Sequence, residues 1–104
     1  LKWEVVEMAG GPAALVRRDT PAMQAAIRAL EAAFGARPVF IREGGSVPVV
    51  SLMQDILGRE SILMGVSLPD DNLHAPNEKF NLDNFFNGVL ASAFLYQEIA
   101  ATRT

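Results

Sequence analysis

Apolar residues in the region 20–35 recur at spacings of three and four, which predicts an amphipathic helix. Thr20 can accept a hydrogen bond from a free backbone N–H at the helix start, and Pro21 gives up no N–H that the helix needs. Gly35 is typical of a helix end. The apolar stripe consists of Met23, Ala26, Ile27, Leu30 and Phe34, opposite Gln24, Arg28 and Glu31. This segment is the clearest helix that the pattern predicts.

Two further helices are predicted downstream. One begins around Ser46 and Pro48 and ends at Gly58. The other begins near Asn81 and continues to about Ala100. The residues expected to be buried on the earlier helix are Val49, Leu52, Met53, Ile56 and Leu57, and those on the later one are Leu82, Phe85, Phe86, Val89, Leu90 and Ala93. The aromatic group of Phe80, Phe85 and Phe86 is assigned to core packing.

Three apolar segments outside these helices predict strands. Residues 1–8 alternate between two faces, residues 38–41 form a short apolar run, and residues 62–66 are apolar throughout, as in a strand that is covered on both faces. The order of elements is then β-α-β-α-β-α, which predicts an α/β (α+β) fold. Polar loops follow the second and third strands, and loops in that position commonly carry chemistry.

Composition and charge narrow the possible functions. The 104 residues, 50% hydrophobic and 20% charged, resemble one ordinary globular domain. A formal net charge of −3 offers no overall attraction to phosphates or acidic lipids, so neither nucleic acid nor a membrane is expected as a partner. No apolar run reaches the roughly 20 residues that span a bilayer, and no secretory signal pattern is present. We therefore expect a cytoplasmic protein.

The absence of cysteine restricts the kinds of metal site that the chain could contribute to. Any metal would have to be held by histidine and carboxylates. His74 is the single histidine, and it lies in a polar loop with Asp70, Asp71 and Glu78, whose oxygens could bind or orient a metal. A lone loop histidine is more often simply solvated, and Asp70 and Asp71 are also ordinary turn formers. The loop alone therefore leaves both interpretations open.

A second candidate site lies at Glu43, Gly44, Gly45 and Ser46. A carboxylate, exposed amides and a hydroxyl could converge there on a ligand at a helix N-terminus. The alternative is a tight turn into the helix, with Ser46 as its cap. Paired glycines suggest an unusual backbone or a close approach. The chain has no dinucleotide-binding, P-loop or nucleophile-elbow motif, so those functions have no support.

Read together and in order, the two loops resemble the co-catalytic zinc peptidases, a family that includes carnosinase-type dipeptidases, glutamate carboxypeptidase, aminoacylase and acetylornithine deacetylase. The strings that carry the resemblance are PVFIREGGSVPVV at residues 38–50 and GVSLPDDNLHAPNEKFNLDNFFNG at residues 65–88. The resemblance implies that His74 binds one of two zinc ions, with manganese or cobalt as possible substitutes. It also implies that Glu43 and Ser46 lie close to the substrate, with Gly44 and Gly45 allowing its approach.

The same resemblance implies that this chain is the C-terminal part of such an enzyme. The family needs an upstream His-x-Asp motif, a bridging Asp and a Glu-Glu pair that supplies the general base, and none is present in this sequence. Residues 1–42 resemble the end of the lid domain, through which these enzymes often dimerise, and residues 43–104 resemble the end of the zinc catalytic domain. We therefore expect no catalytic residue within this piece, and no activity from it alone.

Two functions follow as hypotheses. In the first, the chain is part of a hydrolase that cleaves dipeptides or N-acyl amino acids with zinc-activated water. A dipeptidase is favoured, because the Pro-Asp-Asp-Asn-Leu-His stretch most resembles that branch of the family. Its partners would be the substrate, the missing N-terminal part of the same enzyme and a second copy bound through the lid. In the alternative, the chain is a non-catalytic α/β interaction fragment that self-associates through exposed apolar faces.

Overall fold

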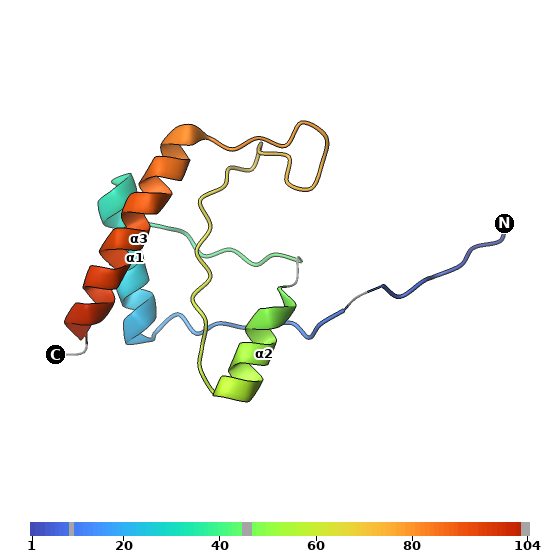
Figure 1. Ribbon diagram of the computed structural model, residues 1–104, viewed down its shortest axis with the longest axis horizontal. Coiled ribbons are helices and arrows are strands. Elements are labelled where there is room, and N and C mark those ends of the chain that lie inside the picture. Colours follow the sequence, from blue (N-terminus) through green and yellow to red (C-terminus); the bar gives the residue numbers. More distant parts are fainter. Residues whose placement is uncertain (9, 45–46, 103–104) are drawn as a thin grey trace. The chain divides into compact units, whose positions relative to one another are not determined.

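The computed structural model describes residues 1–8, 10–44 and 47–102, and these contain three helices (Figure 1). The helices are α1 (Pro21–Phe34), α2 (Pro48–Leu57) and α3 (Leu82–Thr102). No strand occurs among these residues, so the predicted α/β fold with the order β-α-β-α-β-α is wrong for this structure, which is mostly helical.

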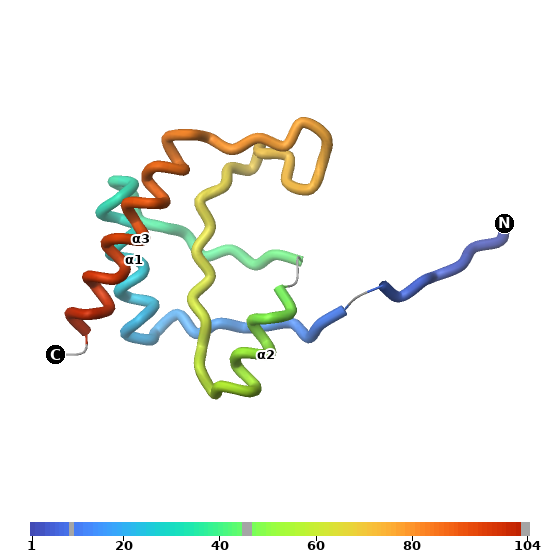
Figure 2. The backbone as a smooth tube through the Cα atoms, viewed as in Figure 1, coloured from blue at the N-terminus to red at the C-terminus, as the bar shows by residue number. Residues whose placement is uncertain are grey.

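The segments that were predicted as strands are extended but unpaired. Residues 38–41 and 62–66 run as extended chain in Figure 2, without forming a ladder anywhere in the described ranges. Along the second segment, Ile62, Met64 and Val66 are half-buried and the residues between them are exposed, which is the alternation of a strand. A strand also needs a neighbour to pair its backbone N–H and C=O groups. The apolar pattern therefore indicates an extended backbone, but it does not show which strand would pair with it.

The chain divides into two compact units, each built from two segments. One consists of Leu1–Arg17 and Ile41–Ser61 and contains α2; the other consists of Arg18–Phe40 and Ile62–Thr104 and contains α1 and α3. This grouping by contacts is not a test of the predicted boundary between residues 42 and 43, which stays a prediction. The candidate loop with His74 belongs to the second unit.

Helix α1 forms as its sequence predicts. The Thr20 hydroxyl accepts a hydrogen bond from the Met23 N–H at 3.2 Å, and Pro21 occupies the first helical position. Gly35 ends the helix in the left-handed conformation, with φ 67°, and its N–H donates to the Glu31 carbonyl at 2.9 Å. The predicted apolar stripe is confirmed: Met23, Ala26 and Ile27 are buried, and Leu30 and Phe34 are half-buried.

Helices α1 and α3 pack against each other, and alanines are among the most deeply buried residues of both helices. Ala25, Ala29 and Ala91 are completely buried, and Ala26 is 1% exposed. Small residues let two helix backbones approach closely, because the distance between helix axes depends on the side chains at the contact. At the rim, Arg28 Nε donates to Glu98 Oε2 at 2.6 Å; both side chains are partly exposed, so this ion pair contributes at most about 1 kcal/mol.

The face of α3 that was predicted to be buried is exposed. Its members range from 43% exposure at Leu90 to 70% at Leu82, and Ala93 is exposed as well. The aromatic rings on this side contact one another edge to face, with centroids 6.2 Å apart for Phe80 and Phe85 and 5.5 Å apart for Phe85 and Phe86. Within the described chain, the buried side of α3 is instead the one with Ala91, where Phe94, Leu95 and Ile99 are half-buried.

Helix α2 has the predicted bounds and a different buried side. It begins at Pro48 and is ended by Gly58 at φ 59°. The residues expected to be buried, Val49, Leu52, Met53, Ile56 and Leu57, are 44–76% exposed, whereas Val50 and Ser51 are buried. Gly11 lies against Pro48 so closely that a Cβ at residue 11 would meet the Pro48 Cβ at 3.1 Å. The chain therefore approaches the start of α2 at a position where glycine fits.

Candidate functional site

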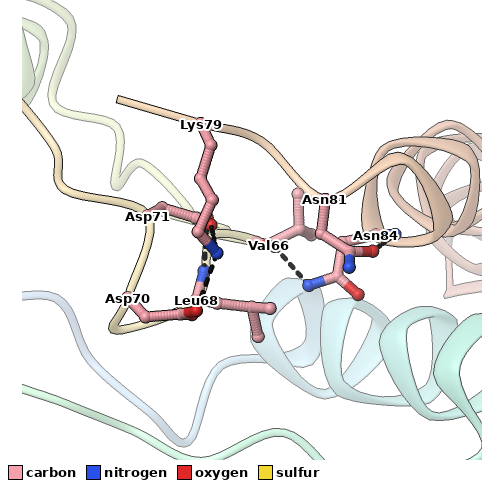
Figure 3. A network of polar contacts seen from close by, with 7 residues as sticks. All are labelled: Val66, Leu68, Asp70, Asp71, Lys79, Asn81 and Asn84. Carbon is pink, nitrogen blue, oxygen red and sulfur yellow. Dashed lines mark hydrogen bonds and ion pairs between the residues drawn. The ribbon is translucent and has the colours of Figure 1, made fainter. Parts of the chain in front are cut away.

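The loop that carries His74 is anchored at the start of α3. The Asn84 side-chain amide donates to the Val66 carbonyl at 3.0 Å, which ties the extended segment before the loop to the helix after it (Figure 3). Asn81 caps that helix, because its Oδ1 accepts the Asn84 N–H at 3.0 Å. Asn84 thus connects the segment before the loop to the helix after it, so both ends of the loop are held in place.

Asp71 and Lys79 close the loop. The Asp71 side chain is 1% exposed, and its Oδ2 accepts the Leu68 N–H at 2.7 Å. The Lys79 N–H donates to the Asp71 carbonyl at 3.0 Å, so the backbone is joined across residues 71–79. The Lys79 ammonium lies 3.5 Å from Asp71 Oδ1, which has no hydrogen bond within the described structure (Figure 3). A buried carboxylate is stable only beside a compensating charge, and Lys79 supplies it.

Lys79 also pairs with the neighbouring carboxylate. Its ammonium donates to Asp70 Oδ2 at 2.7 Å, and this hydrogen bond, together with the positive charge, holds the pKa of Asp70 below its usual value of 3.8. The same hydrogen bond raises the pKa of Lys79 above 10.5, and the negative charges of Asp70 and Asp71 add to that effect. The pairing of both aspartates with Lys79 supports the interpretation of this segment as a shaped turn.

The ion pair between Asp70 and Lys79 has a defined pH range, which an NMR titration can measure. The pKa of Asp70 is lowered, so the charge of Asp70 stabilises the folded loop above pH 3.8, and this stabilisation is lost as the pH falls through the lowered pKa. The pKa of Lys79 is raised, so the charge of Lys79 stabilises the loop until the pH rises above 10.5. We expect the Asp70 carboxyl signal to titrate below 3.8 in the native chain. In Lys79→Met the midpoint should rise, and equal midpoints in both proteins would contradict the assigned pair.

Backbone strain is concentrated inside the closed loop. Three non-glycine residues in the described ranges have positive φ, namely Asn72 at 54°, His74 at 59° and Asn77 at 59°, and all lie between Asp71 and Lys79. Asparagine and histidine are among the residues that tolerate the left-handed region best. An internal turn, in which the Ala75 N–H donates to the Asn72 carbonyl at 3.0 Å, shapes the middle of the loop.

His74 is exposed on this loop, and no hydrogen bond to its imidazole is found in the part of the chain that the structure describes. A free, accessible imidazole is chemically suited to donate to a zinc ion. Within the described ranges, however, no group of three or more histidine or acidic side chains is placed to hold a metal. The chain therefore fits a metal as the source of one donor, and the other ligands are not among these residues.

The second predicted site is described only in part. Glu43 is exposed, and Gly44 forms a bend with open space where a Cβ would lie. Gly44 is not among the described glycines with positive φ, and the close approach suggested for the glycine pair stays a prediction. Gly45 and Ser46 lie outside the described residues. Glu43 and Gly44 belong to one compact unit and His74 to the other, so each is described separately.

Sequence reasoning missed Lys79 and Asn84 as residues that shape the His74 loop. Lys79 was one of few basic residues in an acidic segment, which was a usable signal, because a buried Asp71 requires a nearby cation. Asn84 carried no such signal, since the contact with Val66 joins residues 18 positions apart. Among the described helices, none is both long and apolar enough to cross a bilayer.

Comparison with known proteins gives similar relatives in several organisms. The chain is 36% identical over 74 residues to the Cys-Gly metallodipeptidase dug1 of Schizosaccharomyces pombe, a match that covers 71% of this chain and 16% of that protein. It is 34% identical over 76 residues to the Beta-Ala-His dipeptidase of Homo sapiens, covering 73% of this chain and 15% of the human protein. The chain thus spans about one sixth of the length of these relatives.

A solved structure is similar in fold to most of the chain. The structure of the di-peptidase Dug1p from Saccharomyces cerevisiae superposes with a TM-score of 0.80 at 32% sequence identity, covering 85% of this chain and 18% of that one. The sequence model of peptidase family M20/M25/M40 matches residues 2–98, nearly the whole chain. The resemblance read from the two loops is therefore confirmed, and the chain belongs to peptidase family M20/M25/M40.

Proposed function

We propose that this chain is the C-terminal part of a metal-dependent dipeptidase, in which His74 supplies one metal ligand. The observation that carries the proposal is the exposed His74 imidazole, held on a closed loop of a chain that belongs to a peptidase family. Relatives named as a Cys-Gly metallodipeptidase and as a Beta-Ala-His dipeptidase support dipeptides as the substrate class. N-acyl amino acids remain a second substrate class in the proposal.

Each candidate residue has a proposed task. Zinc, or manganese or cobalt in its place, would polarise the scissile carbonyl and lower the pKa of its bound water towards about 7. His74 would hold one of the two ions through one imidazole nitrogen, while the N–H of the other nitrogen could donate a hydrogen bond to a neighbouring group. Glu43 and Ser46 would contact the substrate, and Gly44 and Gly45 would leave room for it. The open space beside Gly44 agrees with this task.

The remaining machinery would come from outside this chain. One donor cannot hold two ions, and no general base has been assigned here, so we propose that the piece is inactive without the rest of the enzyme. We also propose that residues 1–42 are the end of a lid domain and that residues 43–104 are the end of a catalytic domain. The complete enzyme would form a homodimer through the lid. A cytoplasmic location stays a prediction.

The alternative function has one observation in its favour. Large apolar side chains such as Leu82, Phe86 and Val89 on α3 are 58–70% exposed, and exposed apolar surface favours association. Self-association through this face is the second candidate. It predicts a concentration-dependent oligomer that does not need zinc, whereas the dipeptidase proposal predicts metal-dependent hydrolysis.

Metal removal tests the proposed function. The full-length protein that contains this segment would be dialysed against a chelator and assayed with Cys-Gly, with a β-Ala-His dipeptide and with an N-acetyl amino acid. We expect hydrolysis of the dipeptides to fall to the uncatalysed rate and to return when zinc is added, because the carbonyl is no longer polarised without metal. Hydrolysis that persists after complete metal removal would contradict the proposal, and the acetylated substrate serves as the comparison that decides the substrate class.

A further inference from the structure

The burial of Asp71 is unusual for its surroundings. Its neighbours in the loop, from Asn72 to Lys79, are exposed, yet the Asp71 side chain is 1% exposed and is the largest side chain that is fully buried among the described residues. Acidic side chains are rarely buried so completely unless they are paired. One carboxylate oxygen is used by the Leu68 N–H at 2.7 Å, and the other faces the Lys79 ammonium at 3.5 Å. This carboxylate therefore organises the loop from inside.

Lys79 joins the two ends of the loop through both its backbone and its side chain. The Lys79 N–H meets the Asp71 carbonyl at 3.0 Å, and its ammonium meets Asp70 at 2.7 Å (Figure 3). Between the two ends lie Asn72, His74 and Asn77, with their left-handed backbones. Such backbones are strained for residues other than glycine, although asparagine and histidine tolerate them best, and the surrounding structure has to hold them. The closure holds the two ends of the loop, and the hydrogen bond from the Ala75 N–H to the Asn72 carbonyl holds its middle.

We propose that Asp71 and Lys79 are positioning residues that close the 71–79 loop and thereby hold the His74 imidazole in the orientation in which it binds metal. This inference rests on the proposed function, because it takes His74 as a ligand. Neither residue touches the metal or the substrate in this proposal. Their effect passes through the backbone of the loop, which is already set before metal arrives.

The physical reason is preorganisation. A metal ligand on an open loop must lose conformational freedom when it binds, and that loss weakens the affinity; a ligand on a closed loop has lost it during folding. Residues that orient a ligand from outside the coordination sphere typically change metal affinity by about 10–100-fold. The loop carries its strain at His74 itself, so a loosened closure lets this residue relax away from φ 59°.

The experiment compares four variants of the full-length protein. Lys79→Met removes the ammonium but keeps much of the stem, Lys79→Arg restores the charge, and Asp71→Asn keeps the shape while removing the buried charge. Arg59→Met is the matched control, since it removes one exposed cation from the other compact unit. Zinc affinity is measured by competition with a chelator, and hydrogen exchange over residues 68–80 is measured in the metal-free protein.

We expect Lys79→Met and Asp71→Asn to weaken zinc binding by about 10–100-fold and to speed exchange in the metal-free loop, under conditions where both variants remain folded. Lys79→Met should also lower the urea midpoint, because it leaves the buried Asp71 without its compensating charge. Lys79→Arg should recover most of the affinity, and Arg59→Met should behave as native. At saturating zinc, kcat should return with KM unchanged, because neither Asp71 nor Lys79 contacts the substrate in this proposal. Loss of zinc affinity only in parallel with global unfolding, without rescue by arginine, would overturn the inference.

The failure of this inference can be told apart from failure of the proposed function. If His74→Ala abolishes zinc binding at one site while Lys79→Met binds zinc and exchanges as the native protein does, the function stands and the positioning role is overturned. If His74→Ala leaves zinc binding unchanged, the ligand assignment itself is wrong, and the positioning role falls with it.

Discussion

Replacing His74 by alanine in the full-length protein is expected to remove one metal ion and nearly all dipeptide hydrolysis. Loss of a residue that merely orients a ligand already weakens metal binding by about 10–100-fold, so loss of the ligand should cost at least about 100-fold. The loop itself should survive, because the closure by Asp71 and Lys79 does not involve the imidazole. Metal content by atomic emission and dipeptide turnover at fixed zinc are the two measurements.

Two further variants distinguish the loss of the metal ligand from a change in the backbone of the loop. His74→Asn also removes the imidazole, but asparagine tolerates the left-handed region that His74 adopts at φ 59°. Both His74 variants should therefore lose metal, even where the asparagine protein is the more stable. Leu73→Ala changes an exposed neighbour in the same loop and should retain metal and turnover. Native metal content in His74→Asn would refute the ligand assignment.

The second large effect is expected at the contact between α1 and α3, where Ala91→Leu should destabilise the folded chain. Ala91 is completely buried on α3, and the buried positions of α1 are mostly alanine as well. Three more heavy atoms at such a contact must separate the helices or force strained rotamers, at a cost of typically 1–3 kcal/mol. The free energy of unfolding from urea denaturation measures it.

Ala93→Leu is the matched control on the same helix. Ala93 is exposed, so the same enlargement meets solvent and should change the free energy of unfolding by no more than about 0.5 kcal/mol. The two variants share the change in helix propensity and in hydrophobicity, and they differ only in what the new side chain meets. Equal stabilities for the two proteins would show that α1 and α3 do not pack closely at Ala91.

The three helices could be predicted because their signals are local. Thr20 with Pro21 and Gly35 define the ends of α1 through hydrogen bonds that span three or four residues, and the structure has these bonds. The same holds for the end of α2 at Gly58. Which side of a helix is buried is a different question, because it depends on what lies across from it. On α3 the larger apolar side chains looked like the core, but α1 packs on the side of Ala91.

The prediction of strands failed for a related reason. The apolar run at residues 62–66 does specify an extended backbone, with alternate residues half-buried. Its pairing depends on a neighbouring strand, and no sequence pattern within the run encodes that neighbour. The backbone alone thus resembles the prediction, while the hydrogen-bonded sheet is missing from the described chain.

The candidate site was found partly by chemistry and partly by resemblance. His74 stood out as the one histidine in a loop of oxygen donors, but only the two matched loops favoured a ligand over a solvated side chain. Lys79 was visible in the sequence as a cation among acidic residues, but only the folded loop shows that Asp71 is buried and that Lys79 compensates its charge. Glu43 keeps the role that the resemblance implies as a prediction.

The contact between α1 and α3 also has a consequence for synthesis on the ribosome. Arg28 and Glu98, which pair across these helices, are 70 positions apart in the chain. A helix of 14 residues such as α1 is marginal in water by itself. At about 5–20 residues per second, the 47 residues between α1 and α3 take roughly 2–9 s to translate, so α1 is complete before synthesis of its packing partner begins. Nascent chains of this protein therefore pass through a period in which Met23 and Ile27 are available to chaperones.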